Sequence, residues 1–575
     1  MINLLMDSHI NNSFFQLRDK ELLSRIPLNA KVILEVGCGQ GSLGYEYKKK
    51  NPAVKYIGIE SSTKDAEVAI DKLDTVIIGD VEDFSIWIDR LPKIDCLIFN
   101  NVLQYLKNPF QLLIKQSEFL INEAIVITLF SNPNHWSFLE KILKGSFFLD
   151  DQLYNHNFFH RLTPENLTSI FNENSFQLFD TTAIRAISDS KKCNAFLDKL
   201  SSSLSNFILT REELFSRISP SYYISRAGYI NNNKQQKIDI LLGDIDIKGV
   251  FDSRILIPYK LMSTQPRLDI NISNSIAINN NIFDYPKVFI ISRPIHLRNK
   301  KDINKIKNLI DKNYLIIIDY DDDPNIIPKK YIGWNFTFTS AHAIQTSNNY
   351  LANYLSSFNP EVKVFRNSVP QIGDVKEPLK TPYLRIFFGA LNRKKDWFPW
   401  IKTFNNISNQ YPNKLFFDVV HDFEFYNSID SPQTQKRFTP TCDYPTYLEI
   451  MKGCDICFLP LNNNQFNNCK SDLKAVEAGS FGLALLASSV VYSENFTDGI
   501  NASFFNDSKS LSNILSEWIL DPSKVRSIGR RAQKYVLNNR LFCYQIDERR
   551  EWYDELWSRK DDLTKSIYNR EPNIF

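Results

Sequence analysis

Short apolar runs recur along the whole chain, and stretches with helical spacing separate them. In the first part these runs are KVILEVG, KYIGIESS, DTVIIGDVEDF, KIDCLIFN and EAIVITLF. Apolar runs of about four to eight residues that end in turn residues indicate buried strands. Their alternation with helices predicts an α/β fold with a parallel sheet covered on both faces. Residues 176–186 and 220–230 are expected to form the last two strands of that sheet.

The same alternation starts again after a polar linker. The segment NNNKQQK places a boundary at residues 232 and 233, and four strand-like runs follow it: IDILLGD, KVFIISRPI, YLIIIDYDDDP and EVKVFRNSVP. A third series follows: YLRIFFG, LFFDVVHD, CDICFLPL and LALLASSVVY. We predict a first domain over residues 1–232, then two Rossmann-like domains that face each other over 233–375 and 376–560. Residues 561–575 are expected to form a loosely held tail.

Composition narrows the class of protein. Of 575 residues, 43% are hydrophobic and 23% are charged, and the net charge is only +3. A dedicated nucleic-acid binder should carry a large basic excess, so nucleic acid is not an expected partner. No apolar run approaches the roughly 20 residues that span a bilayer. The start of the chain, MINLLMDSHINNS, lacks the pattern of a secretion signal.

The cysteines fit a protein of the reducing cytoplasm. The chain has eight of them. Cys454 and Cys457 lie in the apolar run CDICFLPL, which is typical of a strand rather than of a zinc site. We predict reduced thiols, no structural zinc and a cytoplasmic location.

Candidate chemistry begins at residues 32–44, VILEVGCGQGSLG. An apolar strand ends in an acid, and glycines at 37, 39 and 41 follow. Glycines with this spacing let the backbone approach a ligand where side chains would block it. The pattern GxGxxG of dinucleotide-binding folds is also formally met, because Gly44 follows Gly41 by three. Other polar residues stand at strand ends, where open α/β sheets bind ligands.

The ordered set of strand-end residues resembles class I S-adenosylmethionine-dependent methyltransferases over residues 25–180. Besides the glycine loop, the resemblance rests on Glu35, on Asp80 followed by Val81, and on the segment DCLIFNNVLQYLKNP. It implies that the methionine part of the cofactor is held by Glu35, Gly37, Gly39 and Gly41. It further implies that Glu60 binds the ribose hydroxyls, that Asp80 and Val81 frame the adenine, and that Asn100 and Asn101 line the reaction mouth.

A catalytic base is less evident in this region. Many relatives carry Glu-His where this chain has Gln104 and Tyr105. The segment YNHNFFHRLTPENL offers His156 and His160, and we name His160 as the candidate base. Packing of a loop is the alternative role for it, and methyl transfer can also proceed by positioning alone. The helical stretch between the last two strands either covers the acceptor or packs as core. The amphipathic segment 137–148 is interpreted as a lid or core helix rather than a membrane-surface helix.

An acidic cluster ends one strand of the second domain. It contains Asp319 and the run Asp321 to Asp323. Such a cluster binds a divalent metal, orients or deprotonates an acceptor hydroxyl, or is a solvated strand end. The residues themselves leave these three alternatives open.

The third domain carries a more specific pattern. The segment CKSDLKAVEAG, with the order of strands around it, resembles the nucleotide-binding domain of GT-B glycosyltransferases, in particular the group 1 (GT4-like) family. The resemblance covers about residues 235–545 and implies that the second domain binds the acceptor. It implies that basic side chains neutralise the diphosphate of a nucleotide-sugar, that Gly389 allows its close approach, and that Glu477 binds its ribose. The basic candidates are Arg393, Lys394, Lys470 and Lys474.

The alternative is that Lys470, Lys474 and Glu477 form only surface pairs along a helix. The chain also departs from the GT-B pattern. Relatives often carry two glutamates eight residues apart, and Cys469 stands at the position of the first. Ala390 replaces the arginine that usually follows the first glycine. Because basic side chains would neutralise the phosphates, no metal site is predicted. Asp321 becomes the candidate base or acceptor contact in the cleft between the two domains. The alternative is that the acidic cluster is only a solvated strand end.

The sequence therefore predicts a bifunctional enzyme of surface glycan biosynthesis. Its expected cofactors are S-adenosylmethionine and a UDP- or GDP-sugar, and its expected partner is a glycan or a lipid-linked oligosaccharide. A lipid-linked acceptor would bring peripheral association with the inner face of the cell membrane. The competing hypotheses are a non-catalytic scaffold role for one of the two parts, and methylation of a substrate that is not a glycan.

Overall fold

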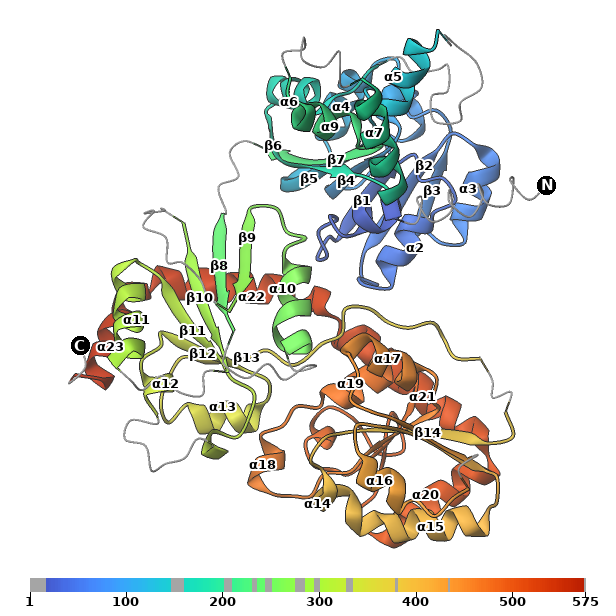
Figure 1. The fold of residues 1–575 in the computed structure, drawn as a ribbon, viewed down its shortest axis with the longest axis vertical. Helices are drawn as coiled ribbons and strands as arrows, with labels where there is room; N and C mark the ends of the chain where they lie inside the picture. The colour runs from blue at the N-terminus through green and yellow to red at the C-terminus, as the bar shows by residue number, and fades with distance from the viewer. Residues whose placement is uncertain are drawn as a thin grey trace. The chain divides into compact units, whose positions relative to one another are not determined.

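The computed structural model describes residues 17–145, 160–200, 209–229, 235–242, 251–274, 285–293, 300–326, 335–377, 381–432 and 435–572. Its contacts divide the chain into two compact units. The first contains Met1–Lys234 with Thr264–Arg267, and the second contains Gln235–Ser263 with Leu268–Phe575. Figure 1 labels their helices and strands. Within the described residues, no helix is both long enough and apolar enough to cross a membrane.

The first unit is built on a seven-stranded sheet in the order β3-β2-β1-β4-β5-β7-β6. The first five of these strands pair in parallel, and β7 pairs antiparallel with both β5 and β6. The expected parallel α/β sheet is confirmed, and its last two strands lie where the pattern placed them. The strands are β1 (Val32–Val36), β2 (Lys55–Glu60), β3 (Thr75–Ile78), β4 (Ile94–Asn100), β5 (Leu120–Ser131), β6 (Phe176–Ile184) and β7 (Tyr222–Tyr229).

Helices cover both faces of this sheet because its central strands are apolar on both sides. Along β4, Leu97 and Phe99 belong to one buried cluster, whereas Cys96 and Ile98 belong to the other. Helices α4 (Pro109–Ser117) and α6 (Pro164–Glu173) contribute to the first cluster. Helices α2 (Ser42–Lys48) and α3 (Thr63–Ile70) contribute to the second.

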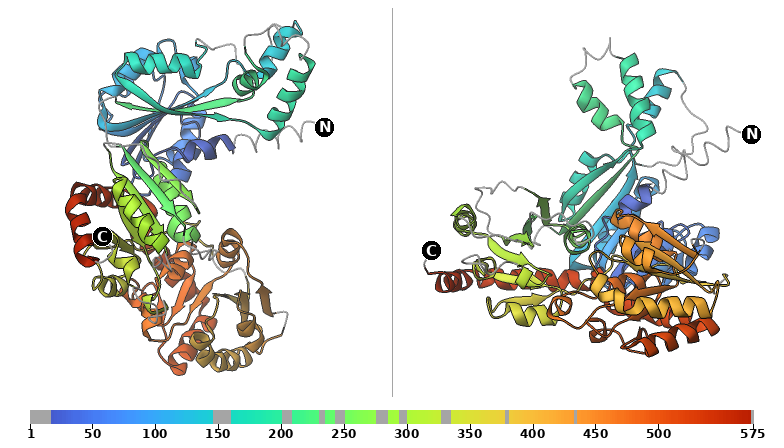
Figure 2. Two further views of the ribbon diagram at one scale, coloured as in Figure 1. Left: turned by 60° about the vertical axis from the view of Figure 1, so that its left-hand side comes forward. Right: turned by 60° about the horizontal axis from the view of Figure 1, so that its bottom comes forward.

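Three further helices form a small cluster of their own. They are α5 (Trp136–Leu143), α7 (Ile187–Lys199) and α9 (Arg211–Ile218), and Figure 2 shows them grouped at one end of the sheet. Cys193, Phe196, Leu197 and Ile218 are buried among them. The apolar spacing in this insertion therefore serves helix packing.

The second unit contains two six-stranded sheets whose neighbouring strands are parallel. The first has the order β13-β12-β11-β10-β8-β9 and the second the order β16-β15-β14-β17-β18-β19. Two Rossmann-like sheets were expected here, so the predicted fold class is confirmed. The strands are β8 (Gln236–Leu241), β9 (Leu268–Ser273), β10 (Lys287–Ser292), β11 (Leu315–Asp319), β12 (Ala343–Thr346), β13 (Val362–Val364), β14 (Leu384–Gly389), β15 (Leu415–Val420), β16 (Lys436–Thr439), β17 (Ile456–Leu459), β18 (Ala484–Ala487) and β19 (Ser503–Phe504).

The helices of this unit alternate with its strands. Those that carry later arguments are a π-helix over Asp252–Leu256, α10 (Ile257–Met262), α14 (Lys394–Trp397), α17 (Tyr444–Lys452), α18 (Gln465–Asn468) and α19 (Leu473–Ser480). The others include α11 (Lys300–Asp311), α13 (Asn349–Leu355), α15 (Ile401–Gln410), α16 (Phe423–Ser428), α20 (Ser508–Leu520) and α21 (Pro522–Asn539).

The chain ends in two helices that return to the first sheet of this unit. In α22 (Ile546–Ser558), Tyr553 donates to Gln345 of β12 at 2.9 Å. The sequence predicted that residues 561–575 are loosely held, and for α23 (Lys560–Arg570) this is wrong. Leu563 and Ile567 are buried, and Arg570 donates to the Thr339 carbonyl at 2.9 Å. This segment is rich in charged residues, and its apolar face consists of only a few residues spaced four apart, so the pattern gave no clear sign of a packed helix.

Candidate active sites

The glycine loop of the first unit joins β1 to α2. Gly37, Gly39 and Gly41 have φ angles of +78°, +51° and +71°, which glycine adopts without strain. A Cβ at Gly37 would lie 2.7 Å from Val102 Cγ1, whereas a Cβ at Gly39 would have no atom within 4 Å. At Gly41 it would lie 3.2 Å from Ala69 of α3. Gly37 and Gly41 thus serve close packing, and Gly39 borders open space.

Glu60 fixes this loop from the end of β2. Its Oε2 accepts the Gly39 N–H at 2.8 Å, and its Oε1 accepts the Ser62 N–H at 2.9 Å. An ionised carboxylate offers about four acceptor positions, so these two bonds leave both oxygens able to accept more. Glu60 itself is not among the residues that line the neighbouring pocket, and its predicted contact with the ribose hydroxyls stays a prediction.

A pocket of about 310 Å³ opens beside the loop. Of the residues nominated from the sequence, Gly37, Gly39, Asn100 and Asn101 line it. Sequence reasoning missed Arg18 and Asp19, which lie in a helical segment before the first strand and belong to no motif. The remaining lining residues are Cys38, Gln40, Ser42 and Leu43.

Glu35 lies beneath this pocket rather than on its wall. The side chain is fully buried, Tyr56 Oη donates to its Oε2 at 2.9 Å, and Asn100 Nδ2 donates to its Oε1 at 2.7 Å. Burial raises the pKa of Glu35 to about 7, although both hydrogen bonds act to lower it. In this arrangement Glu35 orients the Asn100 amide at the pocket.

Asp80 and Val81 are not among the residues that line this pocket. Asp80 is exposed, and its Oδ1 accepts the Glu82 N–H at 2.9 Å. The Val81 carbonyl accepts the indole N–H of Trp87 at 2.8 Å. Both therefore shape the turn after β3, and their predicted contact with adenine stays a prediction.

His160 does not line the pocket either. Its backbone N–H donates to the Gln104 carbonyl at 3.2 Å, and its Nε2 lies 3.2 Å from the Lys107 carbonyl. Since a carbonyl only accepts, this contact requires a proton on Nε2. The ring also packs edge-on against Phe110. The structure gives His160 the contacts of a packing residue, and His156 lies outside the described residues.

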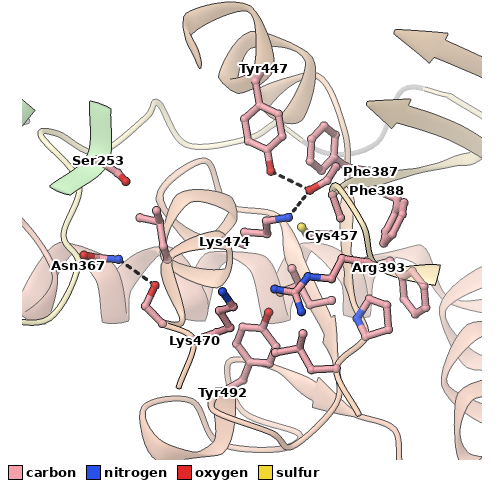
Figure 3. A pocket seen from close by; sticks show the side chains of 18 of the residues that line it. Ser253, Asn367, Phe387, Phe388, Arg393, Tyr447, Cys457, Lys470, Lys474 and Tyr492 are labelled. Carbon is pink, nitrogen blue, oxygen red and sulfur yellow. Dashed lines mark hydrogen bonds between the residues drawn. The ribbon is translucent and has the colours of Figure 1, made fainter. Parts of the chain in front are cut away.

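The second unit has a pocket of about 210 Å³ with walls from both of its sheets (Figure 3). Ser253, Arg293, Asp321 and Asn367 come from the half that carries the first sheet. The other half supplies the remaining wall. Its polar and aromatic members include Gly389, Arg393, Tyr447, Lys470, Ser471, Lys474 and Tyr492.

Three cationic side chains converge on this pocket. Figure 3 shows Arg393, Lys470 and Lys474 directed toward a common space. Lys474 Nζ and Tyr447 Oη both donate to the Gly389 carbonyl. Burial, and next the charge of Arg393, lowers the pKa of Lys474 to about 8. An anion bound among these cations would favour the charged form of Lys474.

Neighbouring polar groups hold two of these cations. Arg393 donates to Asn467 Oδ1 at 2.6 Å and pairs with Asp396 at 3.1 Å. Lys470 forms an ion pair with Asp322, which comes from the other half of the unit. The cations therefore have fixed positions without a ligand.

Two residues nominated for the donor lie apart from this pocket. Lys394 is exposed, and its ammonium pairs with Glu424 at 3.0 Å. Glu477 is 2% exposed, and Tyr444 Oη donates to its carboxylate. Burial raises the pKa of Glu477 to about 7. Its predicted contact with a ribose requires that Tyr444 move or share the carboxylate.

The acidic cluster is paired with arginines. Asp319 binds Arg254 at 2.8 Å, and Arg293 binds Asp321 and Asp322 at 2.8 Å each. In the described part of the chain, no group of three or more His, Cys, Asp or Glu side chains is arranged to hold a metal ion. Of the four aspartates only Asp321 lines the pocket, which is where an acceptor hydroxyl would approach the donor.

Several lining residues had no signal in the sequence. Ser253 lies on the π-helix, a form of helix that often occurs at functional sites. Arg293 follows β10 with a φ of +42°, which is unusual for a residue with a side chain. Cys469 does not line the pocket but is buried in the core cluster of the first sheet. The position where relatives carry an acid is thus turned away from the donor pocket in this chain.

Comparison with known families agrees with both resemblances. Residues 18–209 match the family described as methionine biosynthesis protein MetW, which is methyltransferase-like. Residues 385–546 match the family described as glycosyl transferase-like. No curated protein matches the chain. The chain therefore carries a methyltransferase-like and a glycosyl transferase-like domain, and both are domains of transferase enzymes.

Solved methyltransferase structures also align with part of the chain. A SAM-dependent methyltransferase from Archaeoglobus fulgidus is 15% identical and covers 38% of this chain and 93% of its own, with a TM-score of 0.25. A possible histamine N-methyltransferase from Thermotoga maritima is 14% identical, with coverages of 40% and 96% and a TM-score of 0.28. The plantazolicin methyltransferase BpumL, solved with SAH, is 18% identical, with coverages of 37% and 82% and a TM-score of 0.26.

Proposed function

We propose that this chain is a bifunctional enzyme of glycan biosynthesis. Its second unit transfers a sugar from a UDP- or GDP-sugar to a glycan or a lipid-linked oligosaccharide. Its first unit transfers a methyl group from S-adenosylmethionine to a hydroxyl of the same class of acceptor. The observation that carries this proposal is the convergence of Arg393, Lys470 and Lys474 on one pocket of a glycosyl transferase-like domain.

The cationic pocket suits the departure of a nucleoside diphosphate. Bond cleavage leaves negative charge on the diphosphate, and fixed cations in a partly dehydrated site stabilise that charge better than water does. Gly389 lines the pocket where the phosphates would bind, and glycine is needed there because a Cβ would lie 2.5 Å from the Tyr447 ring. Lys474 would neutralise charge most effectively, since it is held against the Gly389 carbonyl and faces two other cations.

Asp321 is our candidate for the group that accepts the proton of the acceptor hydroxyl. It lines the same pocket as the cations, and Arg293 fixes its carboxylate at 2.8 Å. A general base must be placed within hydrogen-bond reach of the hydroxyl that it deprotonates, and a fixed carboxylate meets that need. The pairing with Arg293 holds the Asp321 carboxylate in one orientation at the pocket.

The pocket of the first unit has the features that S-adenosylmethionine requires. Open space beside Gly39 admits the ligand, and Glu60 has acceptor capacity left for a ribose diol. Arg18 at the rim supplies a positive charge for the carboxylate of the methionine part. When bound, the cofactor supplies a methyl group on a sulfonium that needs no further activation. Asn100 and Asn101 would orient the acceptor, and transfer would rely on positioning.

A binding experiment tests this proposal. Titration calorimetry of the full chain with S-adenosylmethionine, UDP and GDP should give one site for the cofactor and one for a nucleotide. The variant Lys474→Met should bind the nucleotide about thirtyfold more weakly and keep the cofactor heat. Glu60→Gln should lose the cofactor heat and keep the nucleotide heat. The amide of glutamine has no charge and only one acceptor oxygen, so it cannot accept hydrogen bonds from both ribose hydroxyls as a carboxylate does. Absence of both heats in the folded chain would refute the assignment.

The burial of Cys469 favours a second candidate. Without an acid at that position, the second unit lacks a group that touches the transferred sugar in relatives, so a scaffold role for this unit is the competing function. It predicts that a nucleotide binds but that radiolabelled sugar never leaves the donor. A first unit that methylates a substrate other than a glycan would methylate it equally well without any sugar product.

A further inference from the structure

An exposed aromatic ring lies between two cations at the donor pocket. Phe466 is on α18 and is 39% exposed. The Lys470 ammonium lies 4.2 Å from the centre of its ring, and the Arg393 guanidinium carbon lies 5.4 Å from it. Both distances are within the roughly 6 Å at which a ring attracts a cation. One side chain thus contacts two of the four cationic residues that line the pocket, which are Arg293, Arg393, Lys470 and Lys474.

Holding cations together presents a physical difficulty. Like charges repel, so Arg393 and Lys470 would turn toward water unless something keeps them in place. Asp322 and Asp396 do this by ion pairing, but a carboxylate also neutralises the charge and competes with an anionic ligand. The face of an aromatic ring attracts a cation through its quadrupole and carries no net charge. A ring can therefore keep the cations in place and leave their charge available.

Packing alone does not account for Phe466. Its ring is more than one-third exposed, so burial contributes little of its hydrophobic stabilisation. Helix α18 is anchored instead by its neighbour Asn467, which is buried and donates to Asp396 Oδ1 at 2.7 Å. The side chain that follows Phe466 fixes the helix, which leaves the ring free to serve the cations.

We propose that Phe466 is a positioning residue that holds Arg393 and Lys470 convergent for the diphosphate of the donor. Asp322 has the opposing effect, because it occupies Lys470 until the diphosphate displaces it. This inference rests on the proposed donor site and adds to it the group that organises its charge. The inference predicts that loss of the Phe466 ring weakens binding of the diphosphate, whereas loss of the Asp322 charge strengthens it, although both residues contact Lys470.

The test is calorimetric titration of the full chain with pyrophosphate, UDP and GDP at low salt. Phe466→Leu keeps an apolar side chain but removes the ring, and we expect about tenfold weaker binding of each probe. Phe466→Tyr keeps the ring and should bind within about twofold of the wild type. Asp322→Asn should bind about fivefold more tightly, because it removes a competing charge. Phe398→Leu is the matched control, since Phe398 is a 58% exposed ring of the same half and lies outside the pocket.

Two controls make the outcome interpretable. Thermal unfolding of each variant shows whether the second unit stays folded, and the tyrosine variant reports the role of the ring even if the leucine variant unfolds. Equal affinity of Phe466→Leu and wild type, or equal losses in the leucine and tyrosine variants, would overturn the inference while the donor site stands. Failure of the wild type to bind any of the three probes would overturn both.

Discussion

Buried ionisable side chains characterise both sites at the scale of single residues. Glu35 in the first unit and Glu477 in the second are buried, and Lys474 is partly buried. Burial raises the pKa of both glutamates and lowers that of Lys474, which favours the neutral form of each. Such groups cost stability unless a partner compensates them. Tyr56 and Asn100 compensate Glu35, Tyr444 compensates Glu477, and the Gly389 carbonyl compensates Lys474.

The lowered pKa of Lys474 predicts a pH dependence of nucleotide binding. Below about pH 8 the side chain carries its charge, and above that value the free protein loses it. The dissociation constant for UDP or GDP should therefore be flat from pH 6.5 to 7.5 and rise toward tenfold per pH unit above 8. Calorimetry at several pH values measures this.

Lys474→Met provides the reference for that profile. At pH 7 this variant should bind UDP or GDP more weakly than wild type by about 2 kcal/mol, which is roughly thirtyfold. Its dissociation constant should not rise above pH 8. Lys452→Met, which removes an exposed lysine at the end of α17, should retain the wild-type profile. An unchanged pH profile in Lys474→Met would assign the titration to another group.

The raised pKa of Glu35 predicts a loss of stability with rising pH. Its folded pKa is about 7 against an ordinary value of 4.5, so the folded state binds a proton between these values that the unfolded state has released. The contribution is fully present below pH 4.5 and is lost as pH rises through 7. Between pH 4.5 and pH 7 the loss in unfolding free energy amounts to up to about 3 kcal/mol.

Chemical denaturation at pH 5 and pH 7.5 measures this effect. Glu35→Gln should remove most of the difference in unfolding free energy for the first unit. Glu46→Gln, which alters an exposed glutamate paired with Lys49, should leave that difference in place. A wild-type unit that is equally stable at both pH values would show that Glu35 is already ionised.

At the scale of elements, both pockets form where a parallel strand ends and a glycine turn begins. β1 leads to the glycine loop, and β14 leads to Gly389, so exposed backbone forms part of each pocket wall beside the polar side chains. The apolar periodicity of the strands was sufficient to predict this arrangement, because the carboxyl ends of parallel strands share one edge of a sheet. The edge strands β9, β16 and β19 lack a long apolar run and were not predicted.

The direction of individual side chains could not be predicted from the pattern of apolar and polar residues. Arg393 and Lys394 are adjacent in sequence, yet α14 begins between them and directs only Arg393 into the pocket. Arg18 and Ser253 come from segments without a motif, and only the folded chain brings them to a pocket. Glu35 was correctly located at a strand end, but its orientation into the core depends on Tyr56.

The glycine loop gives a prediction at this scale. Gly37→Ala places a Cβ 2.7 Å from Val102 in a left-handed conformation, so we expect the first unit to lose about 2–3 kcal/mol of stability. Gly39→Ala also adopts a positive φ but meets open space, so it should cost only about 1 kcal/mol. Its methyl group would instead enter the pocket and weaken cofactor binding.

Thermal unfolding and cofactor titration together separate these two effects. Val102→Ala should recover part of the stability lost in Gly37→Ala, because it removes the atom that the new Cβ meets. Stability losses of equal size in the two alanine variants, with cofactor binding unaffected in Gly39→Ala, would contradict this account of the loop.

At the scale of the whole molecule, each pocket is formed within one of the two compact units. All lining residues of the first pocket lie between Arg18 and Asn101, and all those of the second lie between Ser253 and Tyr492. The two pockets therefore share no lining residue. Substitutions can therefore test the two pockets separately. We propose that methylation of a sugar hydroxyl modifies the product of the glycosyl transfer and can block its further extension.

Mass spectrometry of glycans from cells that lack the protein, supplied with wild type, Gly39→Ala or Lys474→Met, tests the central claim most directly. We predict that wild type restores both a sugar and a methyl mass. Gly39→Ala should restore the sugar without the methyl group, and Lys474→Met should restore neither, since its acceptor for methylation is missing. Methylated glycan in Lys474→Met cells, or glycans that do not change with any variant, would contradict the account.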